Sequence, residues 1–420
     1  MSGDISILIL RYAFKANHFP LKIIFYYYYV LIKLKLVLLL FENTIMRSIA
    51  VIAILFLFCA EVIGQRHQNV FDAQSLEQGV ISPEQAKIIF KSAKTFPNGS
   101  EFSIAIIRRN KKPEFYGIRK ENDTVNTVIN KKSIFEIGSI SKTFTATLLA
   151  DLSVNGKLNL NDPLKDFVDL GENDSLGITL THLANHTSGL PRLPSNLILW
   201  FADPKNPYKN YGEKDLKNYL AGKIELTTKP GEKSAYSNLG FGLLGYVLTT
   251  KENKTYEELL TKTIFKKYGM PNTTTDRNKV KADLVAGRDP SGEIVPNWDL
   301  NVMEGAGAIL SNVVDLSKYV TAHFNPSDRV LSLTRKPTFR IKSDMEIALS
   351  WFVLDKGELG KWIWHNGGTG GYSSSLALSP ENEYGVVVLT NVSAFHPNRG
   401  SIEDVCFGLM KSIGENDKIK

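Results

Sequence analysis

Short apolar runs bounded by turn residues lie near both ends of the chain, which is the pattern of β-strands. Two such runs cover residues 102–108 and 114–119, and a polar turn at 110–113 separates them, so they are predicted to pair as a hairpin. Four more strands are predicted over 348–354, 361–365, 373–378 and 385–390. The predicted sheet therefore takes its strands from both ends of the chain.

Other segments have helical spacing. Residues 82–85 combine a serine N-cap, a first-turn proline and a capping-box glutamine, which predicts a helix that runs to about Lys94. Apolar residues recur at helical spacing over 144–152, before a stop at Asn155-Gly156, and a terminal helix is predicted from about Ser401. Between 139 and about 296 the pattern is mainly helices and loops.

These elements predict an α/β (α+β) protein with one antiparallel sheet, covered by the terminal helices and carrying an inserted helical region. The sheet part is expected over about 80–138 and 296–415, and the helical part over about 139–295. Catalytic groups would gather at the seam between the two parts. No internal repeat is visible in residues 65–420.

The N-terminal 64 residues are interpreted as targeting sequence. Residues 46–64 combine a short basic start, an apolar stretch and compact residues before Gln65, which is the pattern of a secretory signal peptide. Residues 1–45 are then an upstream extension; the alternative of a membrane segment at 23–41 is weakened by two central lysines. The mature domain would be residues 65–420, secreted or periplasmic, with no stable membrane anchor after cleavage.

Composition narrows the class of protein. The chain has 420 residues, of which 43% are hydrophobic and 22% charged, enough for a large core. Its net charge is +7, but residues 1–64 hold six Lys/Arg and three Asp/Glu, which leaves +4 for the rest. No basic cluster with interleaved aromatics appears, so no nucleic-acid partner is expected. Cys406, the one cysteine outside the signal, lies in an apolar stretch and is interpreted as a buried structural thiol.

Candidate chemistry begins at Ser139 and Lys142, which stand one helical turn apart in the run Phe-Glu-Ile-Gly-Ser-Ile-Ser-Lys-Thr-Phe-Thr at 135–145. Residues i and i+3 share a helix face, so the lysine amine can reach the serine hydroxyl and, if desolvated, accept its proton. An extended segment leads into Gly138 and a helix follows. Ser139 is therefore expected at a helix N-terminus, where free N–H groups favour negative charge.

Two further segments give the pair a context: Tyr236-Ser237-Asn238 and His365-Asn366-Gly367. In this order and spacing, with Ser139-x-x-Lys142, the chain resembles the serine penicillin-recognising hydrolases, nearest to the class C β-lactamases and the related D-alanyl-D-alanine carboxypeptidases, D-aminopeptidases and esterases. The resemblance spans about residues 80–410 and includes the phrases at 181–191 and 304–311. It implies a β-lactamase/transpeptidase-like fold.

The resemblance also implies roles for the site residues. Ser139 would be the nucleophile that carries a covalent acyl group, and Lys142 and Tyr236 would share the base and acid roles. Asn238 would bind the substrate's acyl amide or the lysine. The third motif and the glycine after it would bind substrate, with the N–H groups of Ser139 and Gly368 as the oxyanion hole and Gly368 on an edge strand. No metal or cofactor takes part, and the partner is a small-molecule or peptide substrate.

The third motif departs from the class C pattern, which has Lys-Thr-Gly where this chain has His365-Asn366-Gly367. A lysine is a permanent cation for a substrate carboxylate, whereas a histidine of pKa near ~6.5 is only partly charged at neutral pH. Asn366 also replaces a hydroxyl that would help to hold the carboxylate. Recognition of a carboxylate is thus the least supported part of the resemblance.

The sequence also bears on other functions. His182 and His186 stand four apart, but without a zinc-protease glutamate or a third ligand they do not indicate a metal site. A Ser-His-Asp hydrolase is excluded because no Gly-x-Ser-x-Gly occurs. The preferred function is a secreted serine hydrolase acting on β-lactams or D-amino-acid peptide bonds. The alternatives are a carboxylesterase on the same fold and a non-catalytic protein that binds wall peptides or a partner.

Overall fold

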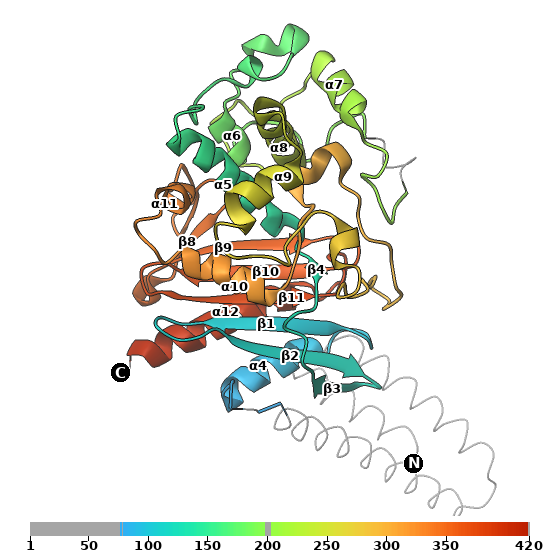
Figure 1. Cartoon of the computed structure of the whole chain (residues 1–420), viewed down its shortest axis with the longest axis vertical. Coiled ribbons are helices and arrows are strands. Elements are labelled where there is room, and N and C mark those ends of the chain that lie inside the picture. The colour runs from blue at the N-terminus through green and yellow to red at the C-terminus, as the bar shows by residue number, and fades with distance from the viewer. Residues whose placement is uncertain (1–75, 78, 198–202, 419–420) are drawn as a thin grey trace, which may run out of the picture. The chain divides into compact units, whose positions relative to one another are not determined.

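The computed structural model describes residues 76–77, 79–197 and 203–418 (Figure 1). Contacts divide the chain into Met1–Phe71 and Asp72–Lys420, and all described residues belong to the second unit. The predicted signal peptide and the extension before it lie outside the described residues, so secretion stays a prediction. Within the described part, no helix has the length and apolarity needed to cross a bilayer.

The described strands form a nine-stranded sheet and a separate two-stranded pair. All ladders in the larger sheet are antiparallel, and its order is β3-β2-β1-β11-β10-β9-β8-β7-β6 (Figure 1). The strand bounds are β1 (Glu101–Ile107), β2 (Glu114–Glu121), β3 (Thr124–Thr127), β6 (Phe339–Lys342), β7 (Met345–Ile347), β8 (Phe352–Asp355), β9 (Lys361–Gly368), β10 (Ser373–Ser379) and β11 (Tyr384–Thr390). The pair is β4 (Phe135–Glu136) with β5 (Leu310–Ser311). N-terminal β1 pairs with C-terminal β11, so strands from both ends of the chain share one antiparallel sheet, as predicted.

Helices cover both faces of this sheet. α4 (Pro83–Ala93) and α12 (Gly400–Lys418) pack on one face, and α10 (Val313–Ala322) packs against β1 and β11 from the other (Figure 1). The helical part above that face centres on α5 (Ser141–Val154) and α8 (Asn238–Glu252). The remaining helices are α6 (Leu180–Ala184), α7 (Glu213–Ala221), α9 (Tyr256–Leu260) and α11 (Arg329–Arg335), and the short turns are η1 (Gly138–Ile140), η2 (Leu164–Asp166), η3 (Gly171–Leu176), η4 (Thr261–Phe265), η5 (Arg277–Val280), η6 (Asn301–Ala306) and η7 (Gly357–Leu359).

The sheet separates two hydrophobic cores. Successive side chains of a strand point to opposite faces, and in β11 Val386 and Val388 join the core under α4 and α12, whereas Val387 and Leu389 join the core under the helical part. Cys406 is fully buried in the first core. Two buried faces explain why the strands are apolar on both sides rather than strictly alternating.

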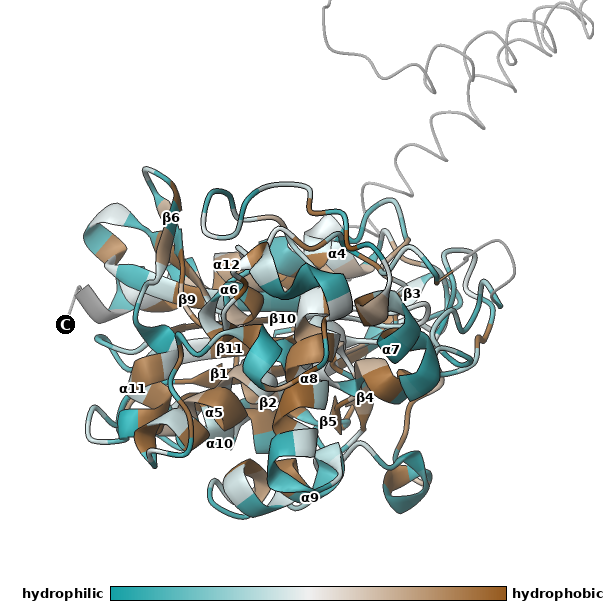
Figure 2. Ribbon diagram, turned by 90° about the horizontal axis from the view of Figure 1, so that it is seen from above, coloured by the Kyte–Doolittle hydropathy of each residue, from teal (hydrophilic) through white to brown (hydrophobic). Residues whose placement is uncertain are grey.

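α5 is buried on all sides over its first ten residues, which include the polar residues Lys142, Thr143, Thr145 and Thr147. The threonine hydroxyls donate to backbone carbonyls, as Thr145 does to Gly305 at 2.7 Å. Apolar residues dominate α5 and α8 (Figure 2), as expected for helices with no solvent-facing side. The helix that begins beside Ser139 is therefore the central element of the helical part.

Most predicted elements are confirmed. α4 begins with the predicted capping box: the Gln85 N–H donates to Ser82 Oγ at 3.3 Å, and the Ser82 N–H donates to Gln85 Oε1 at 3.0 Å. The strand predicted over 348–354 is wrong at its start: the chain turns there, with Ser350 at φ +72°, and β8 begins at Phe352. β6 and β7 were not predicted, because strands of four and three residues are too short to show a period.

The helical part also extends beyond its expected end at residue 295. The turn η6 packs on α8, and α11 packs on α5. Residues 301–306 and 329–335 therefore belong with the helical part in space, between segments that supply the sheet.

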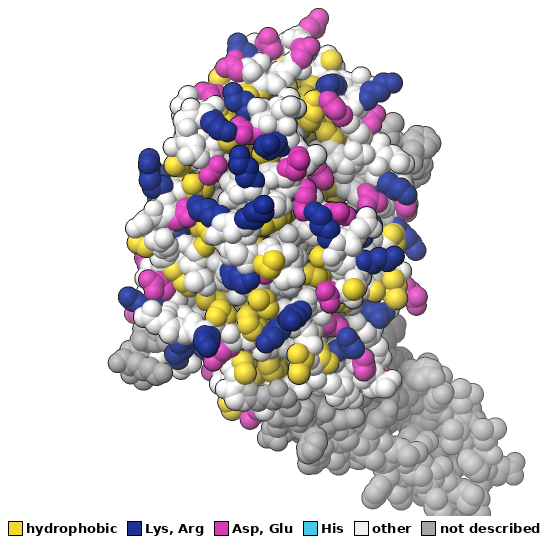
Figure 3. Space-filling model, in the orientation of Figure 1, with side chains coloured by type: hydrophobic (Ala, Val, Ile, Leu, Met, Phe, Trp, Pro, Cys, Tyr) yellow, Lys and Arg dark blue, Asp and Glu magenta, His cyan; other side chains and the backbone are white. Residues whose placement is uncertain are grey.

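On the face shown in Figure 3, basic and acidic side chains are intermixed over the described residues. The positive net charge is not gathered into one patch on that face.

Candidate active site

Ser139 lies in the turn that joins β4 to α5. Gly138 precedes it with φ +50°, a left-handed conformation that favours glycine, and the 3-10 turn η1 runs directly into the first turn of α5. Ser139 is partly exposed, whereas Gly138 and Ile140 on either side are buried. The predicted place of the serine at a helix N-terminus is confirmed.

The Lys142 amine is the centre of a hydrogen-bond network. Its Nζ lies 3.1 Å from Ser139 Oγ, 3.0 Å from Asn238 Oδ1 and 2.6 Å from the Ala306 carbonyl oxygen. Burial, and secondly the charge of Arg192, hold the pKa of this amine well below its usual range. Its three partners come from η1, the start of α8 and the end of η6.

Asn238 is oriented by a second hydrogen bond. Its Nδ2 donates to Tyr208 Oη at 3.1 Å, which leaves Oδ1 facing Lys142. The residue is the first of α8, and the preceding Ser237 caps that helix by accepting from the Gly240 N–H at 2.9 Å. The second motif thus places its amide through a helix start.

Tyr236 completes the set of side chains around Ser139. Its phenol hydrogen-bonds Ser139, and Lys142 Nζ lies 5.0 Å from the ring centroid. Burial raises the pKa of the Tyr236 phenol, against the opposing effects of the Ser139 hydrogen bond and of the Arg192 charge. The structure brings Ser139, Lys142, Tyr236 and Asn238 together as the sequence predicts.

His365 of β9 faces this cluster from the sheet. It is fully buried, its ring centroid lies 6.4 Å from that of Tyr236, and its Nδ1 lies 2.6 Å from the Asn366 carbonyl oxygen. Burial, and secondly the Lys142 charge, lower the pKa of His365 to about 3. The imidazole is therefore neutral at neutral pH, and the third motif carries no cation at all.

Asn366 does not join the site, and its expected place is corrected. Alternate residues of β9 point to opposite faces of the sheet, and the Asn366 amide donates to Glu403 of α12 on the far face. Trp364, two residues earlier, packs on Phe407 of the same helix. The tripeptide supplies one side chain to the site, not two.

Gly367 and Gly368 approach the nucleophile through their backbone. A Cβ on Gly367 would lie 2.0 Å from the Ile137 oxygen and 2.9 Å from the Ser139 nitrogen, and one on Gly138 would lie 2.4 Å from the Gly368 nitrogen. Only residues without a side chain allow so close an approach. The backbone N–H groups of Ser139 and Gly368, expected as the oxyanion hole, therefore both lie where the end of β9 meets the turn before α5.

The expected edge strand needs correction as well. β9 lies between β10 and β8, so it is an internal strand of the sheet. Its pairing with β8 ends at Trp364, whereas its pairing with β10 continues to Gly368. The end of β9 that carries the third motif therefore extends beyond β8 and is an edge only locally.

Sequence reasoning missed four contributors to the site. The Ala306 carbonyl accepts from Lys142, Tyr208 orients Asn238, and Arg192 lies 5.1 Å from the Tyr236 ring centroid. His186, which the sequence suggested only as a metal-ligand candidate, packs with its ring centroid 4.3 Å from that of Tyr236, and its Nδ1 accepts from the Ser237 N–H at 3.2 Å. The segments 181–191 and 304–311, which carry part of the family resemblance, contain His186 and Ala306. Their sequences do not show which residues these two contact.

His182 lies elsewhere in the same segment. Its Nδ1 accepts from the Thr179 N–H at 3.2 Å and so completes the cap of α6. The two histidines therefore have different partners and different roles: His182 caps the start of α6, and His186 packs against Tyr236.

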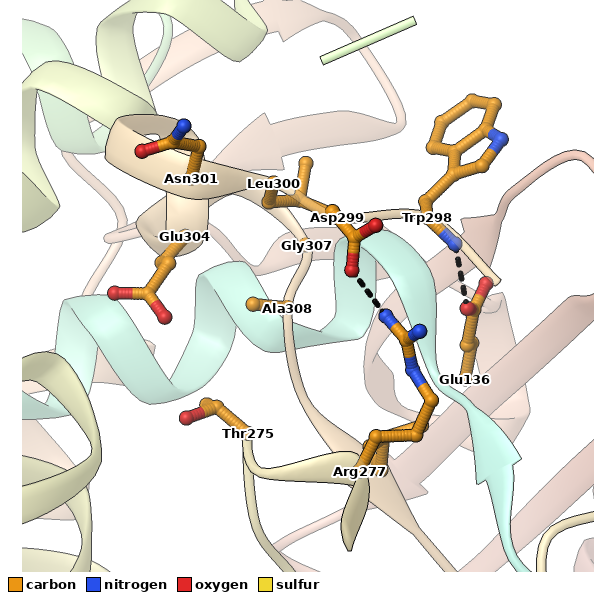
Figure 4. Close-up of a pocket in the computed structure, with 11 residues that line it drawn as sticks. Glu136, Thr275, Arg277, Trp298, Asp299, Leu300, Asn301, Glu304, Gly307 and Ala308 are labelled. Atoms are coloured by element: carbon orange, nitrogen blue, oxygen red, sulfur yellow. Dashed lines mark hydrogen bonds and ion pairs between the residues drawn. The ribbon is translucent and has the colours of Figure 1, made fainter. Parts of the chain in front are cut away.

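A cavity of about 140 Å³ adjoins the site without containing the nucleophile (Figure 4). Figure 4 shows Arg277 directed at Asp299, and the Trp298 backbone N–H donating to Glu136, at 2.9 Å from Oε1. Glu136 is buried, which raises its pKa. These contacts tie the loop before η6 to β4, and so they position the Ala306 carbonyl that Lys142 uses.

Comparison with known proteins agrees with this geometry. The family model described as Beta-lactamase matches residues 99–404. "Protein flp" of Staphylococcus aureus (strain MRSA252) is 28% identical over 348 residues, 79% of this chain, and the chain spans 64% of the length of that relative. A protein named "Beta-lactamase" from Pseudomonas fluorescens is 27% identical over 70% of this chain and 89% of its own length.

Two solved structures share the fold. The Beta-Lactamase/D-Alanine Carboxypeptidase from Pseudomonas syringae superposes with a TM-score of 0.65 at 21% identity, covering 78% of this chain and 98% of that one. The Yersinia pestis protein of the same title, complexed with citrate, gives a TM-score of 0.64 at 23% identity over the same shares. With the family match extending from β1 into α12 and the three motifs assembled around Ser139, this chain belongs to the Beta-lactamase family.

Proposed function

We propose that this protein is a serine hydrolase that acts through an acyl group on Ser139, with Lys142 as the base. The main support for this proposal is the set of hydrogen-bond acceptors around the Lys142 amine. A neutral amine has two N–H groups and one lone pair. The oxygens of Asn238 and Ala306 can only accept, so they take both N–H groups and leave the lone pair for the Ser139 hydroxyl.

The first step follows from this arrangement. Ser139 Oγ attacks the substrate carbonyl carbon while its proton passes to Lys142 Nζ, and the carbonyl oxygen becomes an anion. The N–H groups of Ser139 and Gly368 and the N-terminus of α5 are placed to stabilise that anion. No other cation is required for this step.

Tyr236 is suited to the second step. Because its pKa is raised, the phenol stays protonated and can donate to the leaving nitrogen or oxygen as the bond to the carbonyl carbon breaks. Lys142 then returns a proton to the phenol, and the acyl group remains on Ser139. Water releases the acyl group in a later step and restores the enzyme.

The substrate class proposed is a β-lactam or a D-amino-acid amide. The solved neighbours are titled as β-lactamase/D-alanine carboxypeptidases, and the Pseudomonas fluorescens relative is named a β-lactamase. The neutral His365 favours a second candidate, a carboxylesterase on the same fold, because an ester substrate needs no carboxylate partner at the third motif. The presence of Lys142, Tyr236 and Asn238 around Ser139 argues against a protein that only binds a ligand or partner without catalysis.

The test is intact-mass spectrometry of the purified chain after incubation with a penicillin, alongside turnover of a chromogenic cephalosporin and of a short p-nitrophenyl ester. The proposed function predicts that the mass of the chain increases by the mass of the penicillin. The same increase should be absent in Ser139→Ala. A lasting adduct indicates a peptidase, and cephalosporin turnover indicates a lactamase. Ester turnover without any β-lactam reaction indicates the esterase, and activity retained by Ser139→Ala would overturn the mechanism.

A further inference from the structure

Arg192 is anchored beside the second motif through its backbone. Its carbonyl oxygen accepts from the N–H groups of Asn238 at 3.0 Å and of Leu239 at 3.2 Å, which are the first two residues of α8. These bonds satisfy donors at the helix start that have no partner within the helix. The position of the Arg192 backbone is therefore tied to the helix that places Asn238.

The side chain of Arg192 extends over the active site. Its guanidinium carbon lies 5.1 Å from the ring centroid of Tyr236, whose phenol contacts Ser139. A cation above an aromatic face is held there but keeps its N–H donors free for another partner. The side chain is exposed, and no carboxylate of the described residues forms an ion pair with it.

Apart from Arg192, the cations whose charges act on Tyr236 or His365 already have partners. Lys142 uses its amine within the network around Ser139, and His365 is neutral. Arg399 pairs with Glu403 at 2.6 Å, and this same carboxylate also accepts from Asn366. An anionic group of the substrate would therefore find its positively charged partner in the unpaired guanidinium of Arg192.

We propose that Arg192 binds a carboxylate of the substrate, so that the protein prefers acyl donors that carry a carboxylate close to the bond that is broken. This inference rests on the proposed function and adds a specificity-determining residue to it. The guanidinium presents a planar fork that matches a carboxylate with two parallel hydrogen bonds. It takes the place of the cation that is missing from the third motif.

The experiment compares a penicillin with the methyl ester of the same penicillin. The rate constant for acylation of Ser139 is measured for each by intact mass, and the ratio of acid to ester is the readout. In Arg192→Gln we expect the ratio to fall about tenfold, the effect of losing one charge-assisted contact. Arg192→Lys keeps the charge without the fork and should retain an intermediate ratio.

Two matched variants serve as controls. Arg340→Gln removes the same charge on β6, the end strand of the sheet, and should keep the wild-type ratio. Arg399→Gln removes the paired arginine and should change the ratio less than Arg192→Gln does. Thermal unfolding of each variant checks that the fold is kept, and titration of the acid and the ester into Ser139→Ala, with and without Arg192→Gln, gives the same comparison as binding affinity.

The outcomes separate this inference from the proposed function. A wild-type chain that reacts with both compounds, but whose ratio is unchanged by Arg192→Gln, overturns the role of Arg192 alone. A ratio that collapses in Arg399→Gln and not in Arg192→Gln also overturns it. If the wild-type chain forms no adduct with either compound, the proposed function fails, and the inference fails with it.

Discussion

At the scale of single residues, the environment of Lys142 decides which chemistry the site can perform. The amine is fully buried and has two carbonyl acceptors and one hydroxyl around it, but no carboxylate among its hydrogen-bond partners in the described residues. A buried ammonium without a carboxylate is disfavoured, so the amine gives up its proton more readily than an exposed lysine. The same burial keeps the nearby Tyr236 phenol protonated. The proposed base, Lys142, and the proposed acid, Tyr236, thus differ in protonation because of their surroundings.

Lys142→Arg tests this assignment. A guanidinium stays protonated at accessible pH and has no lone pair for the Ser139 proton, so acylation should fall by about 10²–10⁴-fold. In the wild-type chain the acylation rate should fall as the pH drops through the lowered pKa of Lys142, because protonation removes the base. Raising the pH should not rescue the variant.

The measurement is the acylation rate of Ser139 between pH 5 and pH 9. Lys157→Arg is the matched control, since Lys157 is exposed and pairs with Glu252 at 2.7 Å. Neutral His365, with its pKa near 3, should contribute no step in this range. Wild-type rates in Lys142→Arg would show that another group is the base.

At the scale of elements, the site depends on the contact between the end of β9 and the turn before α5. The backbone at Gly367 packs against Ile137 and Ser139, and Ser374 of β10 donates to the Ile137 oxygen at 2.9 Å. Because β9 extends beyond β8 at this end, Gly367 and Gly368 pair with β10 alone. Sheet and helical part meet at this junction.

Gly367→Ala should separate these two elements. The new methyl group would lie 2.0 Å from the Ile137 oxygen, so the backbone must shift; we expect a loss of about 1–3 kcal/mol of stability and a fall in acylation of about 10²-fold or more. Gly400→Ala is the control, because a Cβ there meets no atom within 4 Å and its φ is not left-handed. Chemical denaturation and acylation rates measure both effects. An acylation rate in Gly367→Ala equal to that of Gly400→Ala would refute the role of this contact.

At the scale of the whole molecule, stability comes from two cores on either side of one sheet, and three histidines are buried near the core under the helical part. His186, His323 and His365 all have a pKa lowered by burial. His323 packs between Tyr319 and Trp351, and neither of its ring nitrogens has a hydrogen-bond partner among the described residues. A buried imidazole that stays neutral lowers the stability of the fold once the pH is low enough to protonate the same imidazole in the unfolded chain.

The pH dependence of folding follows from this. Because the pKa of His323 is lower in the folded state than in the unfolded chain, the unfolded chain binds more protons below about pH 6.5, and stability falls as the pH drops. Each such histidine should cost about 2 kcal/mol between pH 7 and pH 5. His323→Leu should reduce this loss by about that amount. Guanidinium unfolding at the two pH values measures it, and an unchanged pH dependence in the variant would contradict the explanation.

Much of the fold and the core of the site could be predicted because their causes are local. A capping box starts α4 within four residues, apolar runs bounded by turn residues mark β1 and β11, and the i, i+3 spacing places Ser139 beside Lys142. The three motifs correctly predicted that Ser139, Lys142, Tyr236 and Asn238 meet, but they wrongly included the Asn366 side chain. The short strands β6 and β7 were missed because local signals weaken with length.

What only the tertiary structure decided is how those residues are surrounded. The Ala306 carbonyl reaches Lys142 across 164 positions of chain, and burial makes His365 neutral where its residue type alone suggests partial charge. The pairing of β9 turns Asn366 toward α12, and the start of α8 holds Arg192 above Tyr236. The sequence by itself determined the fold family and the pairing of Ser139 with Lys142, because the motifs are readable in their order along the chain and the i, i+3 spacing is local. The charge state of His365, the direction of the Asn366 side chain and the position of the Arg192 guanidinium depend on packing between distant segments, which no local pattern encodes.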